Sequence, residues 1–331
     1  MKIQLDKKLE DIASVENLLE AWKEFLPGKK SKPDAQEFGL RLMENILSLC
    51  DDLINRVYRH GGYRHFRISD PKPRDIHKAG VRDRLLHHAI YRVLYPFFDK
   101  TFISDSFSCR TGKGTHAALN RFRSFSRAAS KNNTRMCRVL KCDIRKFFAN
   151  IDHEILLSTL RPRITDENIM WLLDEVIKSF STPDKPGVGL PLGNLTSQLL
   201  VNIYMNEFDQ FAKHRLKAKY YVRYADDFVI LSDNKEKLEN LLPQIRNFLI
   251  NRLKLELHPD KVFIKTLASG VDFLGWVHFP DHRVLRTATK RRMLKRLSQH
   301  PGRGTFMSYA GLLRHGNTLK IQRRIPRFIV G

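Results

Sequence analysis

Cysteine is scarce in this sequence, and its spacing excludes the common cysteine-based architectures. The 331 residues include four cysteines, Cys50, Cys109, Cys137 and Cys142, and no two of them form a Cys-x-x-Cys pair. Neither a zinc site of the usual spacing nor a disulfide framework is therefore indicated. We expect reduced, partly buried thiols.

Long apolar runs are also missing. No stretch is long enough to cross a bilayer, and the start, Met-Lys-Ile-Gln-Leu-Asp-Lys-Lys, lacks the apolar core of a secretory signal. These absences predict an intracellular, cytoplasmic protein without a membrane partner.

Acidic residues are too few to balance the basic ones. Lys plus Arg number 59 and Asp plus Glu 35, so the formal net charge is 59 − 35 = +24. Residues 281–331 hold 13 basic residues and one acidic residue, 13 − 1 = +12, which is half of the surplus. Within that segment, Lys290, Arg291 and Lys295 lie on a predicted helix. Such a one-sided charge favours a polyanionic partner, most economically nucleic acid, over a merely solvated basic face.

The most informative stretch is residues 220–232, in which two short apolar runs flank Ala225-Asp226-Asp227. The pattern predicts a β-hairpin with adjacent carboxylates at its turn. Two neighbouring carboxylates repel each other and are stable either in water or beside a multivalent cation. The alternatives are a solvated acidic turn and a Mg²⁺ site, and the second needs a third carboxylate from elsewhere in the chain.

Asp143 is the candidate for that third carboxylate, because it ends a strand-like run over 138–143 and precedes Phe147-Phe148. Brought beside the hairpin, it would complete an arrangement that holds two divalent ions about 4 Å apart for phosphoryl transfer. Between the two motifs, a glycine-rich turn over 189–194 runs into a helical pattern.

Other local signals predict further elements. Ser14 and Asp152 are expected to begin helices, since short polar side chains cap free backbone N–H groups. Apolar spacing predicts helices over 34–58 and 235–251, and alternation predicts a strand over 253–258.

Taken in order, these motifs resemble those of reverse transcriptases, most closely the enzymes of diversity-generating retroelements. The resemblance spans about Tyr63 to Phe279 and rests on Asp143 with its aromatic neighbours, Leu-Gly-x-x-x-Ser-Gln, Tyr-Ala-Asp-Asp and Phe-Leu-Gly-Trp. It implies an α+β right-hand polymerase fold with fingers, a palm built on an antiparallel sheet, and a small helical thumb. The implied domains are N-terminal helices and fingers over 1–138, a palm over 139–280 with a fingers insertion at about 153–192, and a basic thumb over 281–331.

The resemblance also assigns the chemistry. It makes Asp143, Asp226 and Asp227 catalytic, and it places a metal site at Asp143, Ile144 and Asp226 for two Mg²⁺ ions, with Mn²⁺ as an alternative. The reaction would be templated addition of a dNTP to a primer 3′-hydroxyl.

The residues implied to surround the incoming nucleotide come from several segments: Lys72, Arg74, Phe148, Leu192, Gly193, Gln198 and Lys261. Lys72 and Arg74 would bind its triphosphate from a hairpin over 63–76, which could otherwise be a solvated basic hairpin. Phe148 matches an aromatic residue that excludes a 2′-hydroxyl and so favours DNA as the product, although a plain core Phe is the alternative. Lys261 would approach the departing pyrophosphate or occupy a solvent-facing turn.

The segment over 192–198 departs from most reverse transcriptases, which carry Gln and Pro where this chain has Leu192 and Gln198. Replacing an amide by an aliphatic group removes a donor and an acceptor from the nucleotide pocket, so mispairs should be penalised less. The same pair of replacements is found in the diversity-generating group, whose enzymes misincorporate opposite template adenines. Adenine-directed infidelity is therefore implied by the resemblance.

Contacts with nucleic acid are implied at Arg84, Tyr224, Gly275, Trp276, Lys290, Arg291 and Lys295. Arg84 would touch the template or brace the hairpin. Gly275 and Trp276 lie in a segment resembling the primer-grip hairpin, where glycine permits a close backbone approach. The basic helix near residue 290 would follow the duplex backbone, with an affinity that falls steeply with salt.

The implied partners are template RNA, the cDNA/RNA duplex, dNTPs and a small basic accessory protein, in an assembly that could be oligomeric. The expected setting is the nucleoid of a bacterial, phage or archaeal host cell. The short tail leaves no room for an RNase H or endonuclease domain, so other factors are expected to remove the template and nick the target.

Three rival interpretations stay open. A retron or group II intron type of reverse transcriptase would be expected to keep Gln and Pro at 192 and 198. Phe148 disfavours an RNA-synthesising polymerase. A non-catalytic RNA-binding scaffold would explain the charge but not three aspartates in ordered motifs.

Overall fold

The computed structural model describes residues 3–69, 73–300 and 302–323. The chain forms two compact units. Unit 1 comprises Met1–Ser104, Ile144–Arg215 and Arg246–Glu256, and unit 2 comprises Asp105–Asp143, Leu216–Ile245 and Leu257–Gly331. This division cuts across the predicted boundaries, so the assignment of fingers, palm and thumb ranges stays a prediction. Across the described ranges, no helix has the length and apolarity needed to span a membrane.

Unit 1 is mainly helical. Its elements are α1 (Leu9–Ala13), α2 (Val15–Phe25), α3 (Pro33–Leu40), α4 (Leu42–Ile54), β1 (Tyr63–Ile68), β2 (Arg74–Ala79), α5 (Val81–Asp99), η1 (Phe147–Asn150), α7 (His153–Leu160), α8 (Glu167–Lys178), α9 (Leu195–Gln210) and η2 (Phe211–Arg215). Ser14 and Asp152 cap α2 and α7 through their side-chain oxygens, as predicted. The helix predicted over 34–58 is divided at Arg41, whose ψ of 43° ends α3 before α4 begins.

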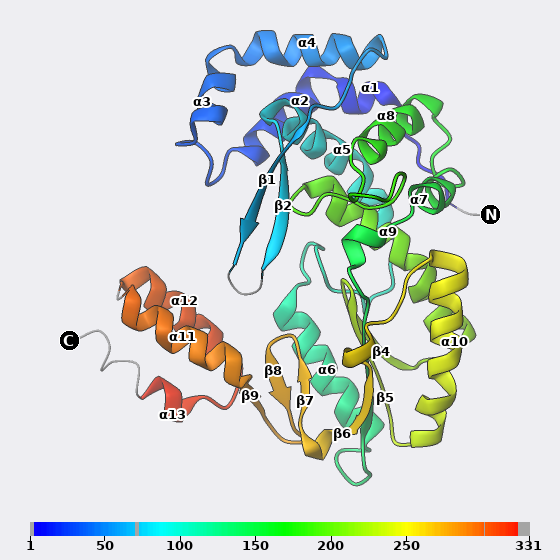
Figure 1. The fold of residues 1–331 in the computed structure, drawn as a ribbon, viewed down its shortest axis with the longest axis vertical. Helices are drawn as coiled ribbons and strands as arrows, with labels where there is room; N and C mark the ends of the chain where they lie inside the picture. The colour runs from blue at the N-terminus through cyan, green and yellow to red at the C-terminus, as the bar shows by residue number, and fades with distance from the viewer. Residues whose placement is uncertain (1–2, 70–72, 301, 324–331) are drawn as a thin grey trace. The chain divides into compact units, whose positions relative to one another are not determined.

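Strands β1 and β2 form an antiparallel hairpin within unit 1, with Tyr63 opposite Ala79 and Ile68 opposite Arg74 (Figure 1). The hairpin confirms the strand pair predicted around residues 63–76. Most of β1 is exposed, so the hairpin presents its side chains rather than burying them.

Unit 2 contains two antiparallel sheets with helices. Its elements are α6 (Thr115–Ala129), β3 (Arg138–Asp143), β4 (Tyr220–Tyr224), β5 (Asp227–Ser232), η3 (Pro259–Lys261), β6 (Phe263–Thr266), η4 (Leu267–Ser269), β7 (Val271–Phe273), β8 (Trp276–His278), β9 (Arg283–Leu285), α11 (Thr287–Gln299), α12 (Arg303–Leu313) and α13 (Leu319–Gln322). The larger sheet has the order β4-β5-β3-β6, and the smaller has the order β7-β8-β9. The three strands of the smaller sheet are labelled in Figure 1. The expected antiparallel sheet and mixed α+β class are confirmed.

Helix α10 (Lys235–Leu253) runs from unit 2 into unit 1 and overturns one prediction. The strand predicted over 253–258 is absent. Leu253 completes the helix, Lys254 adopts a left-handed φ of 48°, and the N–H of Leu255 closes back on the carbonyl of Leu249. This is the geometry of a helix C-terminus, so Leu253 belongs to α10 and the alternating Leu255 and Leu257 follow it outside any of the named strands.

The core of unit 2 lies between α6 and one face of the larger sheet. Side chains two positions apart on a strand share a face, so Val139, Val229 and Leu231 all join the buried cluster that includes Phe122 of α6. The same face continues beyond the apolar residues to the ends of β3 and β5, where charged side chains replace them.

His278 provides a test of the core of unit 2. It is 3% exposed, and burial, followed by the nearby positive charge of Arg283, lowers its pKa to about 3. Between pH 6.5 and about pH 3, His278 is therefore protonated in the unfolded chain but not in the folded chain. The folded state keeps its full stability above pH 6.5 and loses part of it as the pH falls.

We expect His278→Phe to reduce the loss of unfolding free energy between pH 7.5 and pH 5.0 by about 2 kcal/mol. Chemical denaturation at the two pH values measures the difference. An identical loss in the variant and the unaltered protein would contradict the assignment.

Candidate active site

The register of the larger sheet brings two of the predicted aspartates together. Asp143 ends β3, Asp227 begins β5, and the two residues are directly opposed in the antiparallel ladder. Opposed residues of an antiparallel pair point their side chains to the same face of the sheet. Residues far apart in the sequence are thus neighbours at one end of this face.

Asp226 stands in the two-residue turn between β4 and β5, confirming the predicted hairpin with carboxylates at its turn. Ala225, the other turn residue, has a φ of 55°, a left-handed conformation that costs a residue with a Cβ about 1 kcal/mol. Tight hairpins require such a conformation because their turns must match the twist of the strands. The turn therefore fixes where Asp226 leaves the sheet.

Arg223 stabilises this turn through hydrogen bonds. It is fully buried, and its guanidinium donates to the carbonyl of Ala225 at 3.1 Å and to Oγ of Ser106 at 3.0 Å. The backbone of Arg223 also pairs with residues 105–107, because its N–H donates to Asp105 and its carbonyl accepts from Phe107. A strained turn persists when its surroundings hold it in this way.

Electrostatics at the site are dominated by Asp227. Burial raises the pKa of this carboxyl to about 7, the carboxylates of Asp143 and Asp226 push it in the same direction, and the ammonium of Lys141 opposes them. Lys141 is itself buried, with Nζ 3.4 Å from Oδ2 of Asp227. Oδ1 of Asp227 is buried and has no hydrogen-bond partner among the described residues. Lys141 therefore offsets only part of the cost of burying Asp227.

Asp143 is balanced by Lys261 of η3, whose Nζ lies 2.8 Å from Oδ1. The backbone carbonyl of Asp143 accepts a hydrogen bond from the N–H of His258 at 2.7 Å. Lys261 is 42% exposed at its side chain, whereas Asp143 is 15% exposed. Because the side chain of Lys261 is long and half-exposed, it can adopt another rotamer, and the carboxylate of Asp143 could then bind another cation.

The donor set fits hard divalent cations. Within the described ranges, no three His, Cys, Asp or Glu side chains form a ready-made metal cage. Mg²⁺ does not need one, since it is usually held by one or two carboxylates together with water and substrate phosphates. Ile144, also predicted at this site, follows Asp143 with a side chain only 1% exposed, so only its backbone carbonyl could serve as a ligand.

The residues predicted around the nucleotide lie in unit 1, except Lys261. Two hydrogen bonds join β2 to the 192–194 segment: the N–H of His77 donates to the carbonyl of Leu192 at 3.1 Å, and the amide of Asn194 donates to the carbonyl of His77 at 2.9 Å. Gly193 has a φ of 114°, and a Cβ there would lie 3.0 Å from Ile76. Glycine is therefore needed for both its conformation and its size.

The other predicted pocket residues are placed as follows. The carbonyl of Phe148 accepts a hydrogen bond from the N–H of Leu190 at 2.8 Å, which links Phe148 to the segment that precedes Leu192. Gln198 lies in the first turn of α9, and Arg74 is exposed at the start of β2. Lys72 lies outside the described residues.

Two predicted nucleic-acid contacts are engaged within their own units. Arg84 donates to Asp34 at 2.8 Å and stacks over the ring of Phe25, so in this structure it braces the helices beneath the hairpin. The hydroxyl of Tyr224 accepts from Thr115 at 3.1 Å.

The segment likened to a primer grip is a tight hairpin between β7 and β8. Leu274 and Gly275 have φ values of 50° and 84°, which define its turn. Trp276 is 1% exposed, so its side chain belongs to the core and could not contact a primer.

Helix α11 carries the predicted basic surface. Met293 and Leu297 are buried, whereas Arg291 and Lys295 are exposed and Lys290 is half-buried. The helix is thus amphipathic with a cationic outer face, as expected of an element that follows a phosphate backbone.

Sequence reasoning missed Lys141 and Arg223. A lysine inside an apolar strand and an arginine just before the Tyr-Ala-Asp-Asp motif are a usable signal, because charged residues within buried strands are rare unless paired. Their positions beside acidic or turn residues could have marked them as supports of the site.

The support from Arg223 can be measured without reference to activity. Arg223→Met leaves the Ala225 carbonyl and the Ser106 hydroxyl without this donor in a buried setting, and we expect a loss of about 2–4 kcal/mol of unfolding free energy. Arg135→Met is the matched control, since the exposed pair of Arg135 with Asp233 at 3.2 Å should contribute less than about 1 kcal/mol. Equal losses in the two variants, measured by denaturant unfolding, would contradict the role of Arg223.

Known proteins share this fold and motif order. A family model described as reverse transcriptase (RNA-dependent DNA polymerase) matches residues 69–278. Protein YkfC of Escherichia coli is 27% identical over 317 residues, covering 82% of this chain and 80% of that protein. The group II intron-encoded protein LtrA of Lactococcus lactis is 25% identical over 319 residues, covering 75% of this chain and 51% of LtrA, so the chain spans about half of its length.

Among solved structures, apo telomerase from Candida tropicalis, truncated from its C-terminal domain, superposes with a TM-score of 0.52 at 12% identity. The match covers 68% of this chain and 55% of the telomerase chain, which confirms a polymerase-like fold. With the family match spanning both aspartate motifs, the chain belongs to the reverse transcriptase family and is an RNA-directed DNA polymerase.

Proposed function

We propose that this reverse transcriptase copies a template-repeat RNA with adenine-directed misincorporation, as in diversity-generating retroelements, so that the cDNA diversifies a target gene. The observation that carries the proposal is Leu192 together with Gln198. Leu192 is partly exposed, and its carbonyl accepts a hydrogen bond from β2. By family resemblance, its aliphatic side chain stands where most reverse transcriptases carry an amide. Without that amide, a correct base pair loses part of its advantage over a mispair.

The catalytic centre of the proposal is the carboxylate cluster of unit 2. Asp143 and Asp226 would hold two Mg²⁺ ions, with Asp227 and the carbonyl of Ile144 in support. Such ions, when bound, lower the pKa of the attacking 3′-hydroxyl and neutralise charge on the triphosphate. The unpartnered oxygen of Asp227 and its raised pKa are consistent with a site that needs additional positive charge.

The protein's own side chains have separate roles in this proposal. Lys261 leaves Asp143 and places its ammonium toward the departing pyrophosphate. Arg223 keeps the turn rigid, so that Asp226 is presented at a fixed point. Phe148 lies under the sugar and excludes a 2′-hydroxyl, and Arg74 binds the triphosphate as a bidentate donor.

The remaining contacts of the proposal involve nucleic acid and protein. The cationic face of α11 follows the cDNA/RNA duplex, and the β7–β8 turn approaches the primer. By family resemblance, a small basic accessory protein would take part.

A second candidate function is that of a group II intron type of reverse transcriptase. The similarity to LtrA, an intron-encoded protein, favours it. The two candidates differ at residues 192 and 198, where intron enzymes would be expected to carry Gln and Pro.

Removal of a catalytic carboxylate tests the reaction. In a primer-extension assay on an RNA template with Mg²⁺, we expect Asp143→Asn and Asp226→Asn to abolish synthesis while RNA binding stays nearly unchanged. The unaltered protein should extend with dNTPs and not with rNTPs. Extension at the rate of the unaltered protein by either variant would refute the assignment of the site.

The subclass is tested by Leu192→Gln. Restoring the amide should lower the error frequency opposite template adenines and change errors at other bases less, as sequencing of cDNA copied from a defined RNA would show. If the error frequency at adenines does not fall, Leu192 is not responsible for infidelity.

A further inference from the structure

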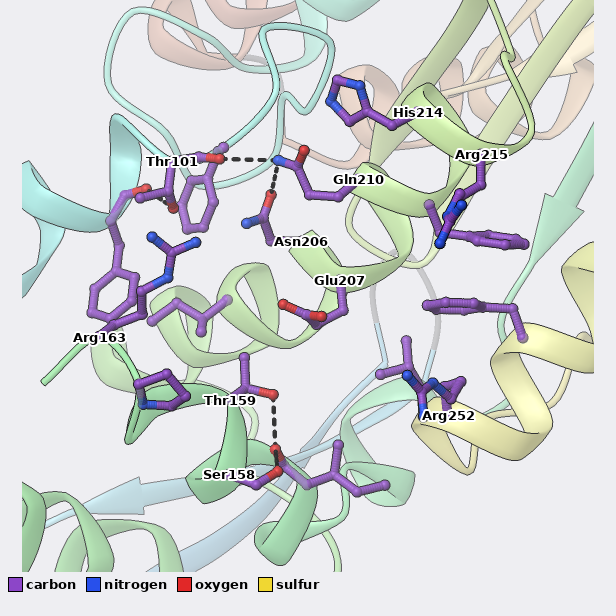
Figure 2. Close-up of a pocket in the computed structure, with 18 of the residues that line it drawn as sticks. Thr101, Ser158, Thr159, Arg163, Asn206, Glu207, Gln210, His214, Arg215 and Arg252 are labelled. Carbon is purple, nitrogen blue, oxygen red and sulfur yellow. Dashed lines mark hydrogen bonds between the residues drawn. The ribbon is translucent and has the colours of Figure 1, made fainter. Parts of the chain in front are cut away.

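Unit 1 contains a large pocket that none of the predicted catalytic or nucleotide-binding residues lines. It is a hollow of about 740 Å³ formed by α7, α9, η2 and the C-terminal end of α10 (Figure 2). We call it the α9 pocket, defined by Arg163, Asn206, Glu207, Phe211, Arg215 and Arg252. Its size accommodates a nucleotide unit.

The charge of the α9 pocket is mostly positive. Its basic lining residues are Arg163, His214, Arg215, Arg252 and Lys254, against one carboxylate, Glu207. Lys254 is already paired with Asp152 at 2.5 Å. Arg215 and Arg252 are exposed, and within the described chain neither has a hydrogen-bond or ion-pair partner. Two unpaired guanidiniums on one side of a pocket favour an anionic ligand, and phosphate matches their geometry (Figure 2).

Two phenylalanines, Phe211 and Phe248, each four residues before one of these arginines, line the same pocket. The rings of Phe211 and Phe248 stack with centroids 4.2 Å apart and planes inclined by 17°. Both residues are half-buried, so part of their apolar surface remains open. Aromatic faces beside a positively charged groove are the means by which proteins bind unpaired bases.

Helix α9 adds polar groups that could meet the edge of a base. Gln210 donates to the carbonyl of Thr101 and to Oδ1 of Asn206, both at 3.2 Å, which holds these amides in place (Figure 2). Glu207 is exposed, and a carboxylate there can accept from an exocyclic amino group of a base. The single acid therefore suits a base rather than a phosphate.

The pocket rim departs from regular helix. Residues Phe211–Arg215 form a π-helical turn that continues directly from α9. Such turns are rare and cluster at functional sites, because the inserted residue shifts the side chains that follow it. Here the shifted residues include His214 and Arg215, which both line the pocket.

We propose that the α9 pocket binds a single-stranded segment of RNA, with Arg215 and Arg252 on its phosphates and a base against the Phe211–Phe248 pair. The enzyme would then have an RNA-binding site that is separate from the carboxylate cluster. The proposal rests on the RNA-copying activity of the family and not on adenine-directed infidelity.

The test is photo-crosslinking with the catalytic channel already filled. The full chain is first bound to a chain-terminated primer–template and then given a labelled RNA of about 12 nucleotides containing 4-thiouridine. We expect adducts in peptides covering 203–215 and 246–254. In the double variant Arg215→Ala/Arg252→Ala, the adduct should be lost and the Kd of the second RNA should rise by about tenfold.

Salt dependence gives a second readout. Loss of two phosphate contacts should reduce the slope of log K against log salt by about 1.4, because single strands release about 0.7 counterion per contact. Arg246→Ala is the matched control, since Arg246 is exposed on the same helix and does not line the pocket. The control should keep the adduct, the affinity and the slope, and thermal melts verify that each variant is folded.

Several outcomes would overturn the proposal: no adduct in these peptides, an undiminished adduct in the double variant, or an equal loss in Arg246→Ala. A parallel arm uses 8-azido-ATP as a free nucleotide. Labelling of the pocket by 8-azido-ATP and not by the RNA would assign it to a free nucleotide and contradict the RNA assignment. None of these readouts depends on the error spectrum, so they fail or succeed independently of the proposed mutagenic function.

Discussion

Partial burial of three neighbouring carboxylates is the constraint on which this end of the larger sheet depends. Asp143 and Asp227 are opposed in the sheet, and Asp226 adjoins them in the turn. Burial is the main cause that raises the pKa of Asp227, and the carboxylates of Asp143 and Asp226 act in the same direction against the ammonium of Lys141. The protein holds them there through backbone register, which cannot relax without breaking the sheet. Carboxylates held in this way are the oxygen ligands that hard divalent cations prefer.

Two lysines, Lys141 and Lys261, partly offset the negative charge of these carboxylates in different ways. Lys141 is buried on the same face of the sheet as Asp227 and pairs with it, so it reduces the cost of burying that carboxylate. Lys261 is half-exposed on a short helical turn and pairs with Asp143 in a way that a metal could replace. Arg223 acts on geometry instead, because its guanidinium holds the carbonyl of Ala225 in the strained turn. Lys141 and Arg223 are thus fixed parts of the structure, whereas Lys261 is a cation that can be exchanged for another.

Local sequence signals predicted those parts of the site that depend on neighbours in the chain. The hairpin around Asp226 and the capping of α7 by Asp152 both follow from residue order alone, and both were confirmed. The strand predicted over 253–258 failed because the left-handed Lys254 ends a helix, which depends on a conformation that alternation does not reveal. The burial of Trp276 is set by tertiary packing, so the local sequence pattern could not predict it. The buried cations under the carboxylates are a tertiary property for the same reason.

The most direct test of the carboxylate cluster is anomalous diffraction from crystals of the enzyme with a chain-terminated primer–template, a dNTP and Mn²⁺. We predict two manganese peaks beside Asp143 and Asp226, with the ammonium of Lys261 displaced from Asp143. Persistence of the Lys261–Asp143 ion pair, with no anomalous peak at either carboxylate, would contradict the claim that this end of the sheet is a divalent-cation site.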